Sequence, residues 1–278
     1  NDGDLSAQAR ALNGLCDIMF EQTQYTNLLE TATRAEKAAW LVGDETQLVY
    51  ALRFKSEAYF HLGDTALAQA SARQTLPFAE RTGEITAVIR SVKLLGALYI
   101  AWGRPAHAQH FINRLEQVIA QREELKQVDG GLMMAYTALG DLRAQMGQYQ
   151  AAGQQFLLAL QRAREADYQR EAAQALYRLG RLARLAGDFK AAIAYYREAL
   201  TIASAIGDRY GEVFFRTDLA GALVGLENFA AAERLLRRVI QFAESKDMMG
   251  GWRGLGQAYL FLAAAMVGHT SSMCAPST

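Results

Sequence analysis

The chain has 278 residues, of which 51% are hydrophobic and 21% are charged, so it can build an apolar core and is not of the disordered class. Its 29 basic and 29 acidic residues cancel, which leaves no overall field to attract nucleic acid or an anionic membrane. The two cysteines, Cys16 and Cys274, lie near opposite ends and form no metal-binding or disulfide pattern, which favours a reducing, cytoplasmic location.

Small residues recur along the chain at nearly constant spacing and define a repeat. They are Cys16, Ser56, Gly96, Gly140, Gly180, Ala220 and Gly256, separated by 40, 40, 44, 40, 40 and 36 residues. Each unit contains two apolar-periodic segments that end at glycine or Gly-Asp signals, as at Gly63 and at Gly43-Asp44. Glycine is favoured just past a helix end because it tolerates positive φ. The pattern therefore predicts helical hairpins that cover their apolar faces by stacking on one another.

The elements expected in chain order are about six helical pairs followed by a final helix. The spacing of 44 adds four residues around 121–129, about one helical turn, and the spacing of 36 removes four before Trp252. Both departures should perturb the array locally. We expect one repeat domain over residues 1–268 and a disordered tail over 269–278, because the tail is rich in small polar residues.

Two segments resemble a known repeat. Trp252-x-x-Leu255-Gly256-x-x-Tyr259 reproduces the signature of the tetratricopeptide repeat, and the run from Gly187 to Ala199 follows the same family pattern. The unit is longer than the familiar one of about 34 residues. It is similar to the repeats of kinesin light chains, of spindle-orientation adaptors and of sensor regions in bacterial signalling ATPases of the STAND class.

The resemblance covers roughly residues 5–268 and implies an all-α fold, a right-handed α-α superhelix of tetratricopeptide hairpins. In proteins of this family the first helix of each pair lines a concave groove that binds a partner. Carried over by position, and with the arginines that recur every three residues on one helix face, the groove residues expected here are Tyr50, Arg53, Glu57, Phe60, Arg90, Lys93, Met134, Thr137, Asp141, Gln174, Tyr177, Arg178, Arg181, Arg184, Phe214 and Thr217.

These residues combine cations with aromatic rings, which suits a peptide that has acidic residues and apolar anchors. The alternative is that the arginines pair with their own neighbours, such as Asp141, Asp167 or Glu171, and only solvate the surface. Replacing Arg181 and Arg184 by alanine separates the two readings, because only a binding role predicts weaker affinity for an acidic partner and a shallower salt dependence.

The sequence contains no catalytic constellation: the nucleophile-elbow, P-loop, dinucleotide-binding and zinc-protease motifs are all missing. His107 and His110 are three residues apart and could share a metal, but no third ligand is near in sequence, so surface histidines are the simpler interpretation. Cys16 occupies a small-residue packing position, which favours an inert buried thiol. We therefore expect a protein without enzymatic activity, metal or cofactor.

Three hypotheses for function follow. The first is a scaffold that binds a protein or peptide in the groove. The second is a sensor segment of a larger bacterial signalling ATPase or transcription regulator, which the start at Asn1 rather than methionine also fits. The third is self-assembly through the end helices, because the expected helix 252–267 has few strongly polar residues and could form a homodimer through Tyr259, Phe261, Leu262 and Met266.

Overall fold

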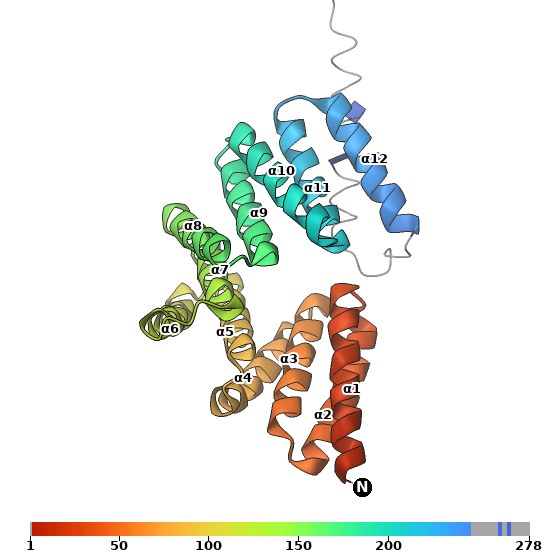
Figure 1. The fold of residues 1–278 in the computed structure, drawn as a ribbon, viewed down its shortest axis with the longest axis vertical. Coiled ribbons are helices and arrows are strands. Elements are labelled where there is room, and N and C mark those ends of the chain that lie inside the picture. Colours follow the sequence, from red (N-terminus) through yellow and green to blue (C-terminus); the bar gives the residue numbers. More distant parts are fainter. Residues whose placement is uncertain (1, 246–260, 263–265, 268–278) are drawn as a thin grey trace, which may run out of the picture. The chain divides into compact units, whose positions relative to one another are not determined.

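The computed structural model describes residues 2–245, 261–262 and 266–267. These residues form twelve α-helices and no strand, pair after pair along the chain (Figure 1). The helices are α1 (Asp2–Glu21), α2 (Tyr25–Val42), α3 (Glu45–Leu62), α4 (Thr65–Thr82), α5 (Ile85–Ala101), α6 (Pro105–Glu124), α7 (Gly130–Gln145), α8 (Tyr149–Glu165), α9 (Gln169–Leu185), α10 (Phe189–Ile206), α11 (Arg209–Gly225) and α12 (Phe229–Ser245). The prediction of an all-α array with about six helical pairs is confirmed.

The turns between successive helices share one conformation. Each contains a single residue in the left-handed region, with φ between 53° and 93°, at positions Thr23, Gly43, Gly63, Gly83, Gly103, Lys126, Gly147, Asp167, Gly187, Gly207 and Glu227. Most of these positions are 20 residues apart, which is half of the 40-residue repeat. Seven of the eleven are glycine, because an L-residue there brings its Cβ too close to the backbone.

Aspartate follows the turn glycine in several copies and begins the next helix. The carboxylates of Asp44, Asp64, Asp188 and Asp208 each accept a hydrogen bond from the backbone N–H three residues ahead, at 2.9 to 3.1 Å. This bond satisfies one of the otherwise unpaired donors of the first helical turn. The Gly-Asp pair thus ends one helix and starts the next, which keeps the helices of a hairpin antiparallel.

The four additional residues of the longer repeat lie where the spacing placed them. Helix α6 has 20 residues against 18 in α4, and the turn that follows it occupies 125–129 instead of two residues as after α4. Asp129 caps α7 through Leu132 N–H, at 3.0 Å. The insertion therefore lengthens a second helix and its turn, and leaves the first helices similar in length.

Small residues allow the helices to approach closely, as their spacing predicted. A Cβ added at Gly180 of α9 would lie 2.6 Å from the ring of Tyr196 on α10, and one added at Gly96 of α5 would lie 2.8 Å from Leu142 on α7. The apolar core is divided into successive clusters, each shared by neighbouring helices. One example joins Cys16 of α1, with Leu28 and Ala32 of α2, to the next pair through Phe54 and Ala58 of α3.

The chain divides into two compact units, Asn1–Gln155 and Phe156–Thr278, and the division falls within α8. Each unit is considered by itself below. The expected single domain over 1–268 stays a prediction, and the expected tail at 269–278 lies outside the described residues. None of the helices in the described part of the chain has the length and apolar character needed to cross a membrane.

Candidate binding face on the first helices

The first helices of neighbouring pairs touch one another within each unit. In the first unit α1 contacts α3, α3 contacts α5 and α5 contacts α7, and in the second unit α9 contacts α11. Among the described residues of the first unit, the second helices α2, α4 and α6 do not approach one another as closely. The side formed by the first helices is therefore the tighter side of this unit, which is where the resemblance placed a groove.

Ion pairs connect successive first helices in the first unit. Arg53 Nη2 lies 3.3 Å from Asp17 Oδ1, Arg90 Nη1 lies 3.4 Å from Glu57 Oε1, and Lys93 Nζ lies 2.5 Å from Asp141 Oδ2. The pairs join α3 to α1, α5 to α3, and α5 to α7. They form a ladder of alternating charge along the first-helix side, in which each of the three expected cations has a carboxylate partner.

Arg53 differs from the other two cations because it is buried, with 5% of its surface exposed. Its guanidinium lies 3.8 Å from the centre of the Phe54 ring. Burial lowers the pKa of Arg53, and the neighbouring charge of Arg90 lowers it further. Such a side chain can orient Asp17 toward a partner, but it offers little surface of its own.

Tyr50 supplies a polar group and an aromatic surface beside the ladder. Its hydroxyl donates to Glu84 Oε2 at 2.8 Å, and Glu84 is the residue that precedes α5. Burial raises the pKa of Tyr50, and the hydrogen bond to Glu84 raises it further, so the phenol remains protonated and keeps donating. The ring is half-buried and stays available for contact.

In the second unit a polar cluster joins α9 to α11. The Tyr177 hydroxyl donates to Asp218 Oδ2 at 2.7 Å, and Arg184 Nη2 lies 3.9 Å from Asp218 Oδ1. Burial raises the pKa of Tyr177, and the Asp218 charge adds to the shift. Arg181 is exposed, with its guanidinium 5.9 Å from the centre of the Tyr177 ring.

The expected groove residues differ in exposure. Arg181 and Gln174 are exposed, and most of the others are half-buried. Thr137 and Thr217 are buried, and their hydroxyls bond to carbonyls of their own helices, those of Met134 and Val213. These two threonines are therefore part of the packed interior and offer no surface to a partner. The half-buried residues are Tyr50, Glu57, Phe60, Arg90, Lys93, Met134, Asp141, Tyr177, Arg178, Arg184 and Phe214.

Sequence reasoning named two acidic partners of the site, Glu57 and Asp141, but missed Asp17 and Asp218. Asp17 occupies the same repeat position as Glu57, 40 residues earlier, so carrying the position back to the first repeat would have found it. Asp218 occupies the same repeat position as Arg178, 40 residues earlier, so carrying that expected position forward would have found it too. Of the three expected alternatives, Asp141 pairs with a cation here, Lys93 of α5.

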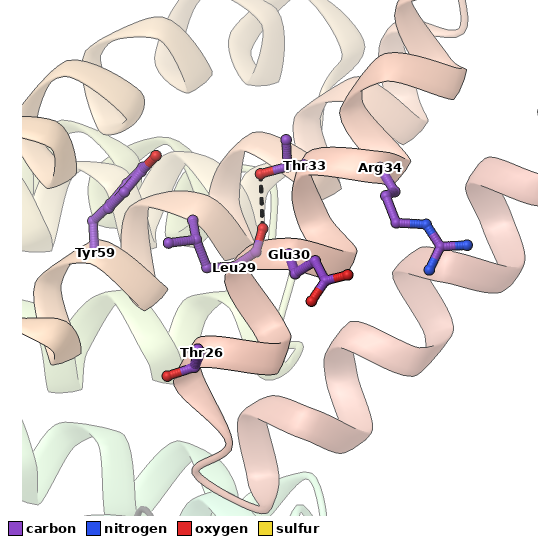
Figure 2. A pocket seen from close by; sticks show the side chains of 6 residues that line it. All are labelled: Thr26, Leu29, Glu30, Thr33, Arg34 and Tyr59. Carbon is purple, nitrogen blue, oxygen red and sulfur yellow. Dashed lines mark hydrogen bonds between the residues drawn. The ribbon is translucent and has the colours of Figure 1, made fainter.

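A shallow hollow of about 510 Å³ lies elsewhere, over α2 (Figure 2). Five of its lining residues lie on this helix, among them Leu29, Glu30 and Arg34, and Tyr59 of α3 completes the lining. The Thr33 hydroxyl that faces it is already bonded to the Leu29 carbonyl at 2.7 Å. None of the expected groove residues lines this hollow.

The remaining candidates for chemistry are engaged in packing. His107 stacks on Tyr99 with ring centres 5.3 Å apart, and His110 packs edge-on against Phe111. No group of three or more His, Cys, Asp or Glu side chains suited to a metal ion occurs within the described residues. Cys16 is buried, and burial raises its pKa to about 12, so its thiol stays protonated at neutral pH.

Comparison with known proteins identifies the repeat. Residues 131–205 match the family model of the tetratricopeptide repeat. No match was found among curated proteins.

Solved structures share the fold at low sequence identity. A Rap protein complexed with Competence and Sporulation Factor is 18% identical, with 95% of this chain and 75% of that chain covered and a TM-score of 0.63. The Rap conjugation gene regulator of the plasmid pLS20, in complex with a Phr peptide, is 15% identical over 93% of this chain and 72% of that chain, with a TM-score of 0.57.

A STAND protein with a tetratricopeptide repeat sensor, from Pyrococcus horikoshii, is also similar. It is 15% identical, with 93% of this chain and 38% of that chain covered and a TM-score of 0.64. At these identities the likeness concerns the fold. The chain therefore contains tetratricopeptide repeats at residues 131–205, set in an all-α array of helical hairpins that has the tetratricopeptide-repeat fold.

Proposed function

We propose that this chain is a regulatory or scaffolding module that binds a segment of another polypeptide along the first-helix side of its hairpins. The observation that carries the proposal is the ladder of oriented charges, Arg53–Asp17, Arg90–Glu57 and Lys93–Asp141, which runs across adjacent first helices. Groups held in place by neighbouring helices lose little side-chain entropy when they bind, and this favours recognition of an extended partner.

The aromatic residues of the same side supply anchors for apolar side chains. Tyr50 and Phe60 lie on α3, and Tyr177 and Phe214 lie on α9 and α11, all of them half-buried. Half-buried aromatic rings beside fixed polar groups are common at binding hot spots, because they offer a large rigid surface at low entropic cost. The Rap regulator solved with a Phr peptide has this fold, which supports a peptide as the type of partner.

Acidic residues of the partner are proposed to bind at α9. In the first unit each of the three ladder cations has a carboxylate beside it, so the three pairs of the ladder carry no net charge. Helix α9 carries four arginines, among them Arg178, Arg181 and Arg184, against one acidic residue, Glu171, and Arg184 contacts the carboxylate of Asp218 on α11. The excess positive charge suits a carboxylate, which arginine can bind through two parallel hydrogen bonds.

A second candidate is a sensor segment within a larger signalling protein, in which the same face would receive a ligand or another part of the polypeptide. The similarity to the STAND protein with a repeat sensor favours it. Both candidates use the first-helix side and need no reaction. Self-assembly through the expected helix 252–267 concerns residues that lie mostly outside the described part of the chain.

The proposal can be tested with selected peptides. A random-sequence library displayed on phage is selected on the immobilised chain, and the enriched peptides are synthesised and titrated by calorimetry. We expect enrichment of acidic and aromatic residues, and weaker binding by the R181A variant, about tenfold for the loss of one charge-assisted contact.

Arg197 provides the matched control, because it is an exposed arginine on α10, a second helix. The R197A variant makes the same change in net charge and should bind the selected peptides as the wild-type chain does. Equal losses of peptide affinity in the R181A and R197A variants would contradict the assignment of the site to α9. Failure to enrich any peptide would argue against peptide binding as the function.

A further inference from the structure

The hollow over α2 lies on a surface that hairpin packing leaves open (Figure 2). Helix α4 has described hairpins on both sides, and forty residues after the hollow it carries the equivalent positions. Four of these residues are exposed even so: Ala66, Ala70, Arg73 and Gln74. A neighbouring hairpin therefore does not cover this side of a second helix, and a partner can reach it.

The following repeat shows what the hollow can hold. Tyr99 of α5 occupies the repeat position of Tyr59, 40 residues later. Its hydroxyl accepts hydrogen bonds from Arg73 of α4 and, at 3.1 Å, from Gln69 of the same helix. The arginine and the glutamine thus lie beside the tyrosine ring, which is only 7% exposed.

The repeat that contains α2 lacks both of these side chains. Thr33 occupies the position of Arg73, and its hydroxyl donates instead to the Leu29 carbonyl, at 2.7 Å. Leu29 occupies the position of the glutamine and has no donor in its side chain. Within the described part of the chain the hydroxyl of Tyr59 makes no hydrogen bond, and its ring is half-buried. The hollow therefore lies where a guanidinium lies in the following repeat.

A carboxylate faces the same hollow from the other side. Successive residues are turned by about 100° around a helix, so Thr33 lies between Leu29 and Glu30. A group placed above Thr33 consequently has Tyr59 on one side and Glu30 on the other. Glu30 is exposed and has no ion-pair partner among the described residues, whereas α4 has Ala70 at this position. The hollow thus combines a free carboxylate with a free phenol.

We propose that this hollow is a second binding site, which takes an arginine side chain of a partner polypeptide. The guanidinium lies above Thr33, donates to the Tyr59 hydroxyl as in the following repeat, and pairs with the Glu30 carboxylate, while the apolar stem lies on Leu29. Arginine suits the site better than lysine, because its planar group directs several N–H donors to two sides at once.

The depth of the hollow favours a side chain over a free small molecule. Sites for small molecules enclose most of the ligand surface, which a shallow hollow on one helix does not do. Arg34 lies beyond Glu30 and points away from Tyr59, so it leaves the hollow open (Figure 2). It offers a cation to an acidic residue that neighbours the arginine of the partner.

The test is an NMR titration of the whole chain with N-acetyl-arginine N-methylamide, up to about 50 mM because one exposed ion pair binds weakly. We expect saturable shifts of the backbone amides of residues 26–34. The lysine analogue should bind more weakly, and the citrulline analogue, in which a neutral group replaces the guanidinium, should not saturate. Glu30→Gln should raise the dissociation constant for the arginine probe about threefold.

Thr33→Arg reproduces the arrangement of the following repeat, because it places the chain's own guanidinium beside Tyr59. It should abolish binding of the probe in a chain that stays folded, which circular dichroism verifies. Glu124→Gln is the matched control, since Glu124 is an exposed glutamate at the end of α6, another second helix. This variant should bind the probe as the wild-type chain does.

Four results would overturn the assignment of an arginine site to the hollow. They are the absence of saturable shifts at residues 26–34, an equal response to the citrulline analogue, binding that T33R leaves intact, and equal losses in E30Q and E124Q. None of the expected groove residues lines the hollow, so this outcome and that of the peptide selection are independent.

Discussion

At the scale of single residues, most turns place glycine in the left-handed conformation, but four turns place there a residue whose Cβ makes this conformation unfavourable. Glu227 has a φ of 58° and occupies the turn position that Gly187 occupies 40 residues earlier. Replacing Glu227 by glycine should raise the free energy of unfolding by about 1 kcal/mol, because the left-handed conformation strains any residue with a Cβ. Chemical denaturation followed by circular dichroism measures the change.

The reciprocal variant, Gly187→Glu, controls for the loss of the side chain itself. An added Cβ at Gly187 meets no atom within 4 Å, so its effect comes from the backbone alone. It should lower the free energy of unfolding by about 1 kcal/mol. If both variants changed stability in the same direction, the turn conformation would not be the cause.

Gly180 illustrates the close approach that the small-residue repeat predicted. Its Cβ would lie 2.6 Å from the buried ring of Tyr196, so Gly180→Ala should lower the free energy of unfolding by about 1–3 kcal/mol. Tyr196→Leu should be destabilising alone but should relieve part of the penalty of G180A, since it removes the ring atoms in conflict. A double-mutant cycle measures this coupling. Strictly additive effects would contradict the packing described.

At the scale of helices, the ion-pair ladder joins neighbouring first helices. Asp17→Asn removes the charge that faces the buried Arg53, which also lies near the like charge of Arg90. It should lower the free energy of unfolding by about 1 kcal/mol, less than for a fully buried pair because 69% of the Asp17 side chain is exposed. Denaturation at low and at high salt measures the effect.

The exposed pair of Arg81 with Glu45, at 2.7 Å, is the control. Glu45→Gln should change stability much less, because water screens both partners. Equal effects of D17N and E45Q would show that the ladder contributes no more than an ordinary surface pair, and its role in orienting the binding face would lose its support.

How far the sequence predicts these features differs between the helices and their contacts. Glycine followed by aspartate marks the end of one helix and the start of the next, so the turn at Gly43-Asp44 could be predicted from the sequence. The left-handed turns at Thr23, Lys126 and Glu227 were not, because those residues ordinarily avoid this conformation. The pairs between helices, such as Tyr177 with Asp218, depend on how far each helix is rotated against its neighbour, which a single sequence leaves open.

Arg53 shows the same limit at the binding face. The family position placed it in the groove, yet it is buried over the Phe54 ring. Exposure at such a position depends on the size of neighbouring side chains, since a large ring beside a long side chain shields it from water. Position within a repeat therefore predicts which side of the helix a residue occupies, and packing decides how much of it a partner can reach.

At the scale of the whole molecule, neighbouring hairpins within each unit pack on one another, and polar residues join the first helices of each unit. In a structure of this kind stability is local, and surface properties can vary from one pair to the next without disturbing the rest. The balanced charges of the ladder in the first unit and the arginines of α9 illustrate this freedom. We infer that the repeat fold supplies rigidity, and that a few side chains determine the partner.

The most direct test of the central claim is hydrogen–deuterium exchange of the chain with and without a selected peptide. The account predicts slower exchange of backbone amides in the first helices α9 and α11 on binding, with little change in the second helices α10 and α12. Protection confined to the second helices, or tight binding that protects neither set, would contradict it.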